Sequence, residues 1–368
     1  MALGLEEIKR RLRVFAETEA AGNSPLYEHL TAKAAEDDEV AGLLTSAADA
    51  EARGTLFMAA AHRLIQADPI HPLSRYFPSL GGFDGVDSET WPMFREFLLS
   101  REDKVRALIA GRYTQTNEVG RATLFYPALS IAAKETGGKI ALLEVGCSAG
   151  LLLGMDKFSY RYQCDGGEQL SAGPAKAAVG LHCALDLAPG AVLPKLLKKL
   201  TITARAGLDR APVDAGDEDE LAWLEACVWA DQPDRSRLLR TAAAAQRKYV
   251  PELITGDAVD DLAAAAATLP DDVPLVVLTS HVLTYLGDRR PDFLTALRKL
   301  AGERPLWWVS NESYKAGLEY VLPGRDDLVN PAKVTSVLGL VRWHDGEADA
   351  RALARTDPHG HRMTWLPA

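Results

Sequence analysis

The chain has 368 residues, 47% of them hydrophobic and 25% charged, so it can bury a large core and form more than one domain. A formal net charge of −10 disfavours non-specific binding to nucleic acid or anionic membranes. The first residues are charged where a signal peptide needs an apolar core, and no apolar run reaches membrane-spanning length. We therefore expect a cytoplasmic protein with a small-molecule substrate and neither a nucleic-acid nor a membrane partner.

The first part of the chain has helical periodicity. Apolar residues from Leu5 to Ala20 recur on one helical face, and Ser24-Pro25 marks the start of a second helix. Similar patterns predict helices over 39–47, 55–66 and 91–111. We expect a helical cap or lid region over residues 1–112.

Polar side chains gather just after this region, ahead of an apolar helical run over 124–133. A solvated helix entry is one interpretation. The other is the wall of a substrate site, because amide, carboxylate and guanidinium groups can converge on one ligand. The cluster consists of Gln115, Asn117, Glu118 and Arg121.

The segment 139–150, KIALLEVGCSAG, has an apolar run without polar alternation, typical of a strand covered on both faces. A glycine-containing turn follows. Gly146 and Gly150 allow backbone angles closed to other residues and close packing of a helix on the strand. We expect that helix to begin near Ser148, with its first N–H groups free for a ligand.

The turn lacks the features of two common phosphate-binding loops. Ser148 stands where a dinucleotide-binding loop needs its central glycine, and no G-K-[ST] ending is present. Glu144, two residues before Gly146, is similar to the first motif of S-adenosylmethionine-dependent methyltransferases. That resemblance implies S-adenosylmethionine as the cofactor, with Glu144, Gly146, Ser148 and Gly150 in contact with it. An ordinary turn in a doubly wound protein is the structural alternative.

Alternating aromatic residues over 156–162 and the turn Asp165-Gly166-Gly167 predict a β-hairpin, inserted outside the parallel sheet over about 157–199. The next parallel strand is predicted over 200–208, just before Asp209. A carboxylate at this strand end can accept hydrogen bonds from both hydroxyls of an adenosyl ribose. Asp165 is the competing candidate for that role.

The rest of the chain alternates between helices and strands. This alternation predicts a doubly wound, Rossmann-like α/β domain over 113–368, with a C-terminal antiparallel edge hairpin over 334–365. Ligands of such sheets bind at the carboxyl ends of the strands. Three further strands are predicted, over 252–255, 273–279 and 306–309. Asp257 follows the first and is assigned to the cofactor, His281 follows the second, and Asn311 and Glu312 follow the third.

Four cysteines show no C-x-x-C pairing and no zinc-type histidine spacing, so reduced thiols and no metal site are expected. Cys147 lies in the glycine turn without a histidine or lysine near it in sequence. We do not expect it to be a nucleophile.

Several motifs together resemble, over the whole chain, the uncharacterised bacterial family called domain of unknown function 2332. They are TQTNEVGR at 114–121, SAGL at 148–151, WLEACVWADQPDR at 223–235, GDAVDDL at 256–262 and SNE at 310–312. The resemblance implies a methyltransferase-like Rossmann domain behind a helical region. Two positions depart from the family. Members often carry Asn where this chain has Leu152, and they carry a histidine more often at the position of Thr279 than at that of His281. If the strand continues past Thr279, His281 would face the same side and could replace that histidine.

We therefore expect methyl transfer from S-adenosylmethionine to a small acceptor of unknown identity. Such transfer requires alignment of the nucleophile and removal of its proton, and His281 is the candidate base. A histidine satisfied by its neighbours at a strand end is the structural alternative. Asn311 and Glu312 are expected to line the acceptor pocket.

Two other functions are compatible with the same fold. A non-catalytic ligand-binding or regulatory protein is the main alternative, because residues 280–283 do not resemble the Asn-Pro-Pro-Tyr motif of many amino-methylating enzymes. A nicotinamide-dependent oxidoreductase is disfavoured by the missing central glycine.

Overall fold

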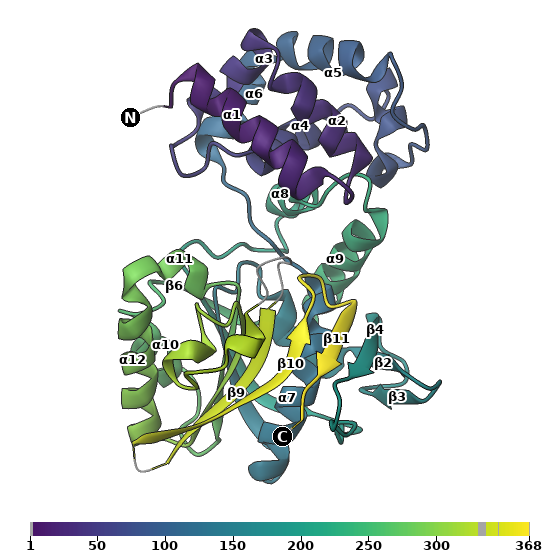
Figure 1. The fold of residues 1–368 in the computed structure, drawn as a ribbon. Helices are drawn as coiled ribbons and strands as arrows, with labels where there is room; N and C mark the ends of the chain where they lie inside the picture. The colour runs from purple at the N-terminus through teal and green to yellow at the C-terminus, as the bar shows by residue number, and fades with distance from the viewer. Residues whose placement is uncertain (1–2, 330–335, 345, 368) are drawn as a thin grey trace. The chain divides into compact units, whose positions relative to one another are not determined.

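The computed structural model describes residues 3–329, 336–344 and 346–367. The chain forms two compact units (Figure 1). The helical unit comprises the chain up to Asn117 together with Ala215–Arg240, and the sheet unit comprises Glu118–Asp214 and Thr241–Ala368. The first boundary lies five residues beyond the predicted one, at 112. The segment 215–240, predicted to belong to the sheet domain, groups instead with the helical unit.

Aromatic packing explains this grouping. The Trp229 ring stacks on Tyr27 at a centroid distance of 5.3 Å and lies 5.7 Å from the ring of Phe15. Trp223 is also buried in this core, and its indole N–H donates to the carbonyl of Tyr113 at 3.0 Å. The segment 215–240 therefore contributes core side chains to the helical unit, although about 100 residues separate it from the rest.

The helices of the first region follow the predicted pattern. α1 (Leu5–Phe15) buries its apolar face, and α2 (Pro25–Ala34) starts at proline with Ser24 as its N-cap, whose hydroxyl accepts from the Tyr27 N–H at 3.1 Å. The other helices before the sheet unit are α3 (Asp38–Leu43), α4 (Gly54–Gln66), α5 (Thr90–Leu99) and α6 (Glu102–Gly111). Two later helices are α8 (Glu218–Cys227) and α9 (Pro233–Gln246).

The described residues of the sheet unit form one eleven-stranded, mostly parallel sheet in the order β3-β2-β4-β11-β10-β9-β8-β7-β1-β5-β6. The five strands β6-β5-β1-β7-β8 are parallel, and their order reverses between β1 and β7. Such a reversal is the switch point at which open α/β sheets bind ligands. The bounds are β1 (Lys139–Val145), β2 (Ser159–Cys164), β3 (Gln169–Ala172), β4 (Gly180–Leu187), β5 (Thr201–Asp209), β6 (Glu252–Thr255), β7 (Leu275–Ser280), β8 (Leu306–Glu312), β9 (Ser336–His344), β10 (Glu347–Thr356) and β11 (Arg362–Trp365).

Helices cover both faces of the parallel strands. Neighbouring residues on β8 point to opposite faces. The Trp307 indole N–H donates at 3.2 Å to Glu135 of α7 (Ala122–Glu135), while the Trp308 ring lies 6.2 Å from Phe293 of α12 (Arg290–Glu303). The two short helices of this unit are α10 (Leu262–Ala267) and α11 (Leu283–Leu286). No helix in the described residues is both long and apolar enough to cross a membrane.

Two predicted placements in the sheet need correction. The β2–β3 hairpin does not lie outside the sheet, because β2 pairs in parallel with β4 and β4 with β11. The C-terminal hairpin of β9 and β10 is therefore internal and not an edge. The open backbone groups of a strand edge can pair with any extended segment, so sequence alternation does not identify the partner. Residues 334, 335 and 345 of the predicted hairpin lie outside the described residues.

Candidate functional site

The glycine turn after β1 is not followed by the predicted α-helix. Gly146, Ser148 and Gly150 have φ values of 74°, 48° and 64°, and a short 3₁₀ helix, Leu151–Lys157, comes next. A Cβ added to Gly146 would lie 2.2 Å from Cγ2 of Val282, so this position needs glycine for both conformation and space. The left-handed residues interrupt a right-handed helix. The turn therefore cannot present a ligand with the free N–H groups of an α-helix start.

Asp209 is held against this turn. It ends β5, the strand that pairs with β1, and its Oδ2 accepts the Ser148 N–H at 2.8 Å. Its Oδ1 accepts the Ala211 N–H at 2.9 Å. A carboxylate has about four lone-pair positions, so each oxygen retains capacity for another donor. Asp165 lies in the β2–β3 turn, far from β1 in strand order, so only Asp209 adjoins the glycine turn.

Glu144 lies beside Asp209 near the end of β1. Its side chain is buried, and its Oε2 has no hydrogen-bond partner among the described residues. Burial raises the pKa of Glu144 well above its ordinary value, the charge of Asp209 raises it further, and Arg121 opposes the shift. Glu144 is therefore a buried carboxyl that favours its protonated form.

The carboxyl end of β8 holds three more buried polar side chains. Glu312 Oε1 accepts the Val282 N–H at 3.0 Å, and Asn311 Oδ1 accepts the Thr356 hydroxyl at 2.7 Å. Burial raises the pKa of Glu312 to about 7. Glu312 Oε2, Asn311 Nδ2 and the Ser310 hydroxyl have no hydrogen-bond partner within the described part of the chain. Buried polar groups without partners are rare in proteins, so this strand end is a candidate ligand site.

His281 does not continue β7. The strand ends at Ser280, and His281 has a φ of 57°, rare for a residue other than glycine. It therefore does not repeat the orientation of Thr279, whose hydroxyl accepts the Trp308 indole N–H at 3.1 Å. The suggested replacement of the family's histidine by His281 is not supported by this backbone.

The surroundings of His281 also weaken it as a base. Burial and the charges of Arg121 and His359 lower its pKa to about 3, and its Nε2 lies 3.3 Å from the Ser336 hydroxyl. A general base is most effective when its pKa is near the working pH. Glu312 meets this condition better than His281.

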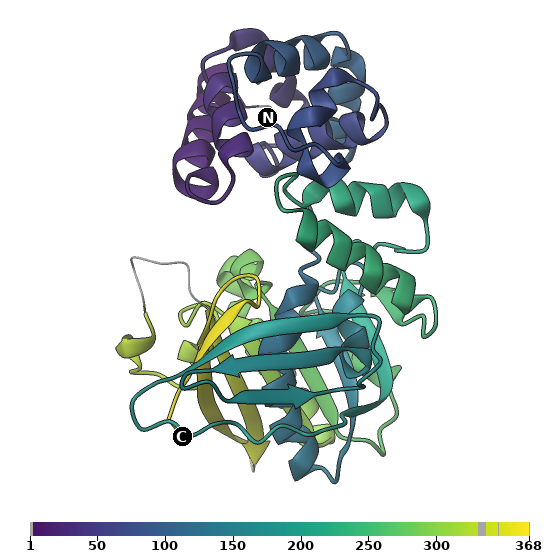
Figure 2. The same ribbon diagram turned by 90° about the vertical axis from the view of Figure 1, so that its right-hand side faces the viewer.

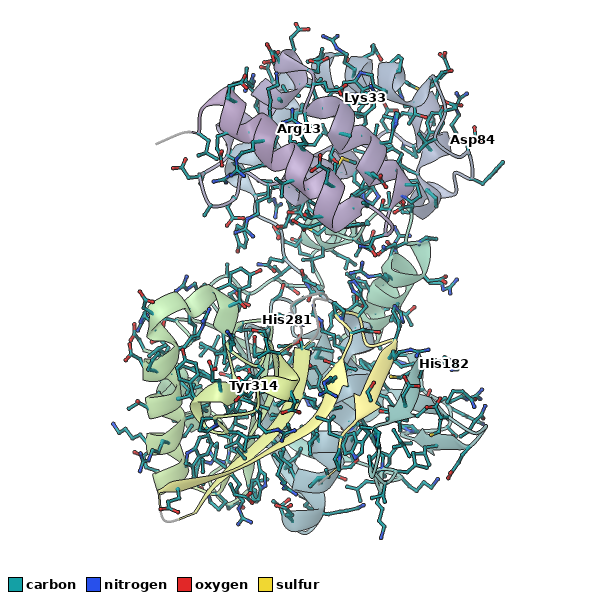
Figure 3. The ribbon with its side chains drawn as sticks, viewed as in Figure 1. Arg13, Lys33, Asp84, His182, His281 and Tyr314 are labelled. Carbon is teal, nitrogen blue, oxygen red and sulfur yellow. The ribbon has the colours of Figure 1, made fainter. Side chains whose placement is uncertain are left out.

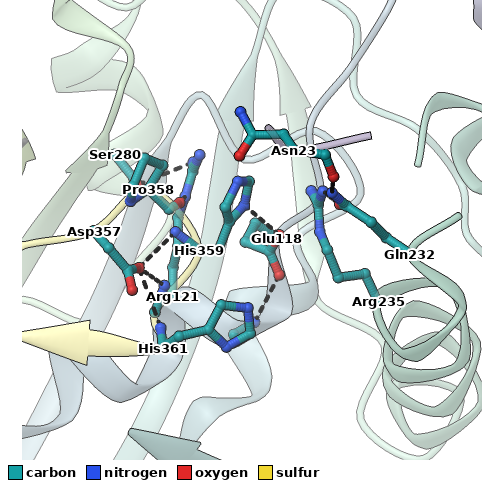
Figure 4. A network of polar contacts seen from close by, with 12 residues as sticks. Asn23, Glu118, Arg121, Gln232, Arg235, Ser280, Asp357, Pro358, His359 and His361 are labelled. Atoms are coloured by element: carbon teal, nitrogen blue, oxygen red, sulfur yellow. Dashed lines mark hydrogen bonds and ion pairs between the residues drawn. The ribbon is translucent and has the colours of Figure 1, made fainter. Parts of the chain in front are cut away.

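Arg121 and Glu118 connect the start of α7 with the turn between β10 and β11 (Figure 4). Arg121 donates to the carbonyl of Pro358 at 2.8 Å and to the Ser280 hydroxyl at 3.4 Å. Glu118 Oε2 lies 3.0 Å from Nδ1 of His359. Arg121 is thus anchored at the end of β7, near the candidate site.

Gln115 and Asn117 belong to the helical unit, so their predicted contact with substrate stays a prediction. The Gln115 amide donates to the Tyr113 hydroxyl at 3.1 Å within that unit. Figure 4 also includes a contact inside the helical unit, from the Gln232 amide to the carbonyl of Asn23 at 3.5 Å.

Asp257, after β6, is already engaged by cations. Its carboxylate lies 2.9 Å from Arg210 and 3.1 Å from Arg289, and it accepts the Val259 N–H at 2.9 Å. Burial alone would raise its pKa, but the hydrogen bonds from Arg210 and backbone N–H groups and the charge of Arg289 lower it to about 2. A ligand would meet an ion-paired Asp257, so its cofactor role also stays a prediction.

Cys147 is buried in the glycine turn. Burial raises the pKa of its thiol well above the ordinary value, and the charge of Asp209 adds to this shift. A protonated thiol is a poor nucleophile, which supports the expectation that Cys147 does not react. Within the described ranges, no group of three or more His, Cys, Asp or Glu side chains is placed to hold a metal ion.

Sequence reasoning missed Ser280, which contacts Arg121, and Thr356, which contacts Asn311. Thr356 lies on antiparallel β10, 45 residues after Asn311. The only signal for Ser280 was its place at a predicted strand end. Nothing in the local sequence marks Thr356.

Residues 9–365 match the model of the family described as an uncharacterised protein conserved in bacteria, DUF2332. The chain belongs to this family. No curated protein and no solved structure matches it. Membership in DUF2332 assigns no reaction, so a functional hypothesis must rest on the geometry of the site.

Proposed function

We propose that this DUF2332 protein binds S-adenosylmethionine at the carboxyl ends of β1 and β5 and transfers its methyl group to a small acceptor. The observation that carries the proposal is the fixed carboxylate of Asp209. Backbone N–H groups of Ser148 and Ala211 orient it, one on each oxygen. The remaining lone pairs suit the two neighbouring hydroxyls of a ribose.

The charges around the glycine turn also suit this cofactor. When bound, S-adenosylmethionine supplies a methyl group on a positively charged sulfonium. Glu144 and Asp209 place two carboxyl groups next to each other, and the pKa of Glu144 is raised by burial and by that neighbour. A cationic ligand would favour the ionised form of Glu144 and so relieve its unfavourable burial.

The end of β8 supplies the groups for the acceptor. Glu312, with a pKa of about 7, can take a proton from an acceptor near neutral pH. Asn311 keeps an unpartnered amide nitrogen, judged among the described residues, that can donate to the acceptor. Arg121 and Glu118 complete the site from the start of α7. His281 would then line the site without removing the proton.

A non-catalytic ligand-binding protein is the second candidate. The observation that favours it is His281, the predicted base, whose pKa of about 3 leaves it a weak proton acceptor at neutral pH. On this alternative the same cofactor binds, Glu312 has no acceptor to deprotonate, and no methyl group is consumed.

Titration calorimetry tests cofactor binding with S-adenosylmethionine, S-adenosylhomocysteine and NAD. We expect the two adenosyl-sulfur ligands to bind and Asp209→Asn to weaken them by about 2 kcal/mol, because charge-assisted hydrogen bonds to the ribose are lost. Asp165→Asn, in the distant β2–β3 turn, is the matched control and should bind normally. Unchanged affinity in folded Asp209→Asn, or a preference for NAD, would contradict the proposal. Incubation of the protein with methyl-labelled cofactor and small-molecule extracts separates catalysis from binding alone. Transfer of the label from the cofactor to an extracted molecule indicates catalysis, and a label that stays on the bound cofactor indicates binding only.

A further inference from the structure

The sheet unit has a second site candidate, remote from the glycine turn. A hollow of about 380 Å³ lies over β2, β3 and β4, at the end of the strand order opposite to β1, β5 and β6. These strands face the viewer in Figure 2, with no helix of the sheet unit in front of them. Figure 3 labels His182 on β4, well apart from His281 at the strand ends.

Polar side chains line this hollow in matched positions. Arg161 on β2 stands directly opposite His182 on β4 in the parallel pairing. On the other side of β2, Gln163 is paired with Gln169 of β3, whose amide donates to the Gln163 side-chain oxygen at 2.8 Å. His361, just before β11, completes the rim. The arrangement concentrates N–H donors from four separate segments of chain.

No carboxylate of the described residues lines the hollow. Among the described residues, the side chains of Arg161 and His182 have no ion pair or hydrogen bond, whereas nearby Arg362 pairs with Asp186 at 3.0 Å. This small basic surface occurs on a chain whose net charge is −10. Its missing counter-charge is what an anionic ligand would provide.

We propose that the hollow binds the phosphate group of a small phosphate monoester. The Arg161 guanidinium can donate two parallel hydrogen bonds to phosphate oxygens, and the imidazoles of His182 and His361 can donate to the others. Gln163 and Gln169 then contact the esterified part. A volume of about 380 Å³ exceeds the needs of a bare phosphate ion and lies within the usual range for small-molecule sites. This site is independent of the proposed cofactor site.

The test is calorimetry of the whole chain with glycerol 3-phosphate, inorganic phosphate and sodium chloride at matched ionic strength. We expect saturable binding of glycerol 3-phosphate at millimolar concentration, tighter than that of inorganic phosphate. Arg161→Gln and His182→Gln should each weaken it about tenfold, because a charged or ring N–H donor is lost. Arg362→Gln removes another exposed arginine that does not line the hollow, and should bind as the wild type does.

Each outcome decides the proposal. Absence of saturable binding, or equal binding by Arg161→Gln, His182→Gln and wild-type protein, would overturn it. Equal affinity for inorganic phosphate and the ester would overturn the assignment of a monoester. Arg161 and His182 are exposed, so both variants should fold, and circular dichroism checks this.

Discussion

Glu312 should make the stability of this protein fall as the pH rises. In the folded chain its pKa is about 7, against an ordinary value of 4.5, because the side chain is only 1% exposed. Between these two values the folded state holds a proton that the unfolded state has lost. Unfolding therefore becomes easier as the pH increases through this window, by about 3 kcal/mol in total for a shift of this size.

The variant Glu312→Gln should remove this dependence. Glutamine has nearly the same shape, cannot ionise, and keeps an oxygen that can accept the Val282 N–H, now bonded at 3.0 Å. Its amide hydrogens add a constant cost at every pH. The informative quantity is thus the change between pH 5 and pH 8, in which wild type should lose about 2.5 kcal/mol more stability than the variant.

Urea unfolding of both proteins at several pH values measures this difference. Glu168→Gln, in the exposed β2–β3 turn, controls for the loss of one surface charge and should follow the wild-type curve. Parallel curves for wild type and Glu312→Gln would show that Glu312 does not titrate in this window. They would also remove the argument for Glu312 as a base near neutral pH.

Three further predictions concern the glycine turn and its surroundings. Calorimetry should show that the affinity of the wild type for S-adenosylmethionine rises with pH, by up to about tenfold per pH unit, whereas the affinity of Glu144→Gln does not. The same pH dependence of the affinity in both proteins would refute a role for Glu144. Gly146→Ala should lower stability to urea by at least about 1 kcal/mol more than Gly166→Ala, because both have positive φ but only the first Cβ meets Val282; equal losses would contradict this. Arg121→Ala should weaken cofactor binding per folded molecule, because the charge of Arg121 acts on Glu144 beside the glycine turn; a lower melting temperature with normal affinity would make Arg121 a packing residue.

The amino-acid sequence determined where the parallel strands lie. Strands covered on both faces are largely apolar, and this signal located β1 and β7. The strands β5, β6 and β8 were also predicted within about two residues at each end, except that β8 continues to Glu312. The helical face of α1 and the proline start of α2 were equally local signals. Because parallel strands place their carboxyl ends at one edge, the sequence also predicted where Glu144, Asp209 and Glu312 would gather.

Only the tertiary structure decided how distant segments combine. Backbone hydrogen bonding is common to all residues, so the sequence did not specify that β4 pairs with β11 or that β9 and β10 are internal. Aromatic packing drew 215–240 into the helical unit. The low pKa of His281 and the orientation of Asp209 depend on burial and on groups far away in the chain, such as Arg121 and Ser148. Burial and distance between charges are properties of the folded chain, and no local pattern of residues encodes them.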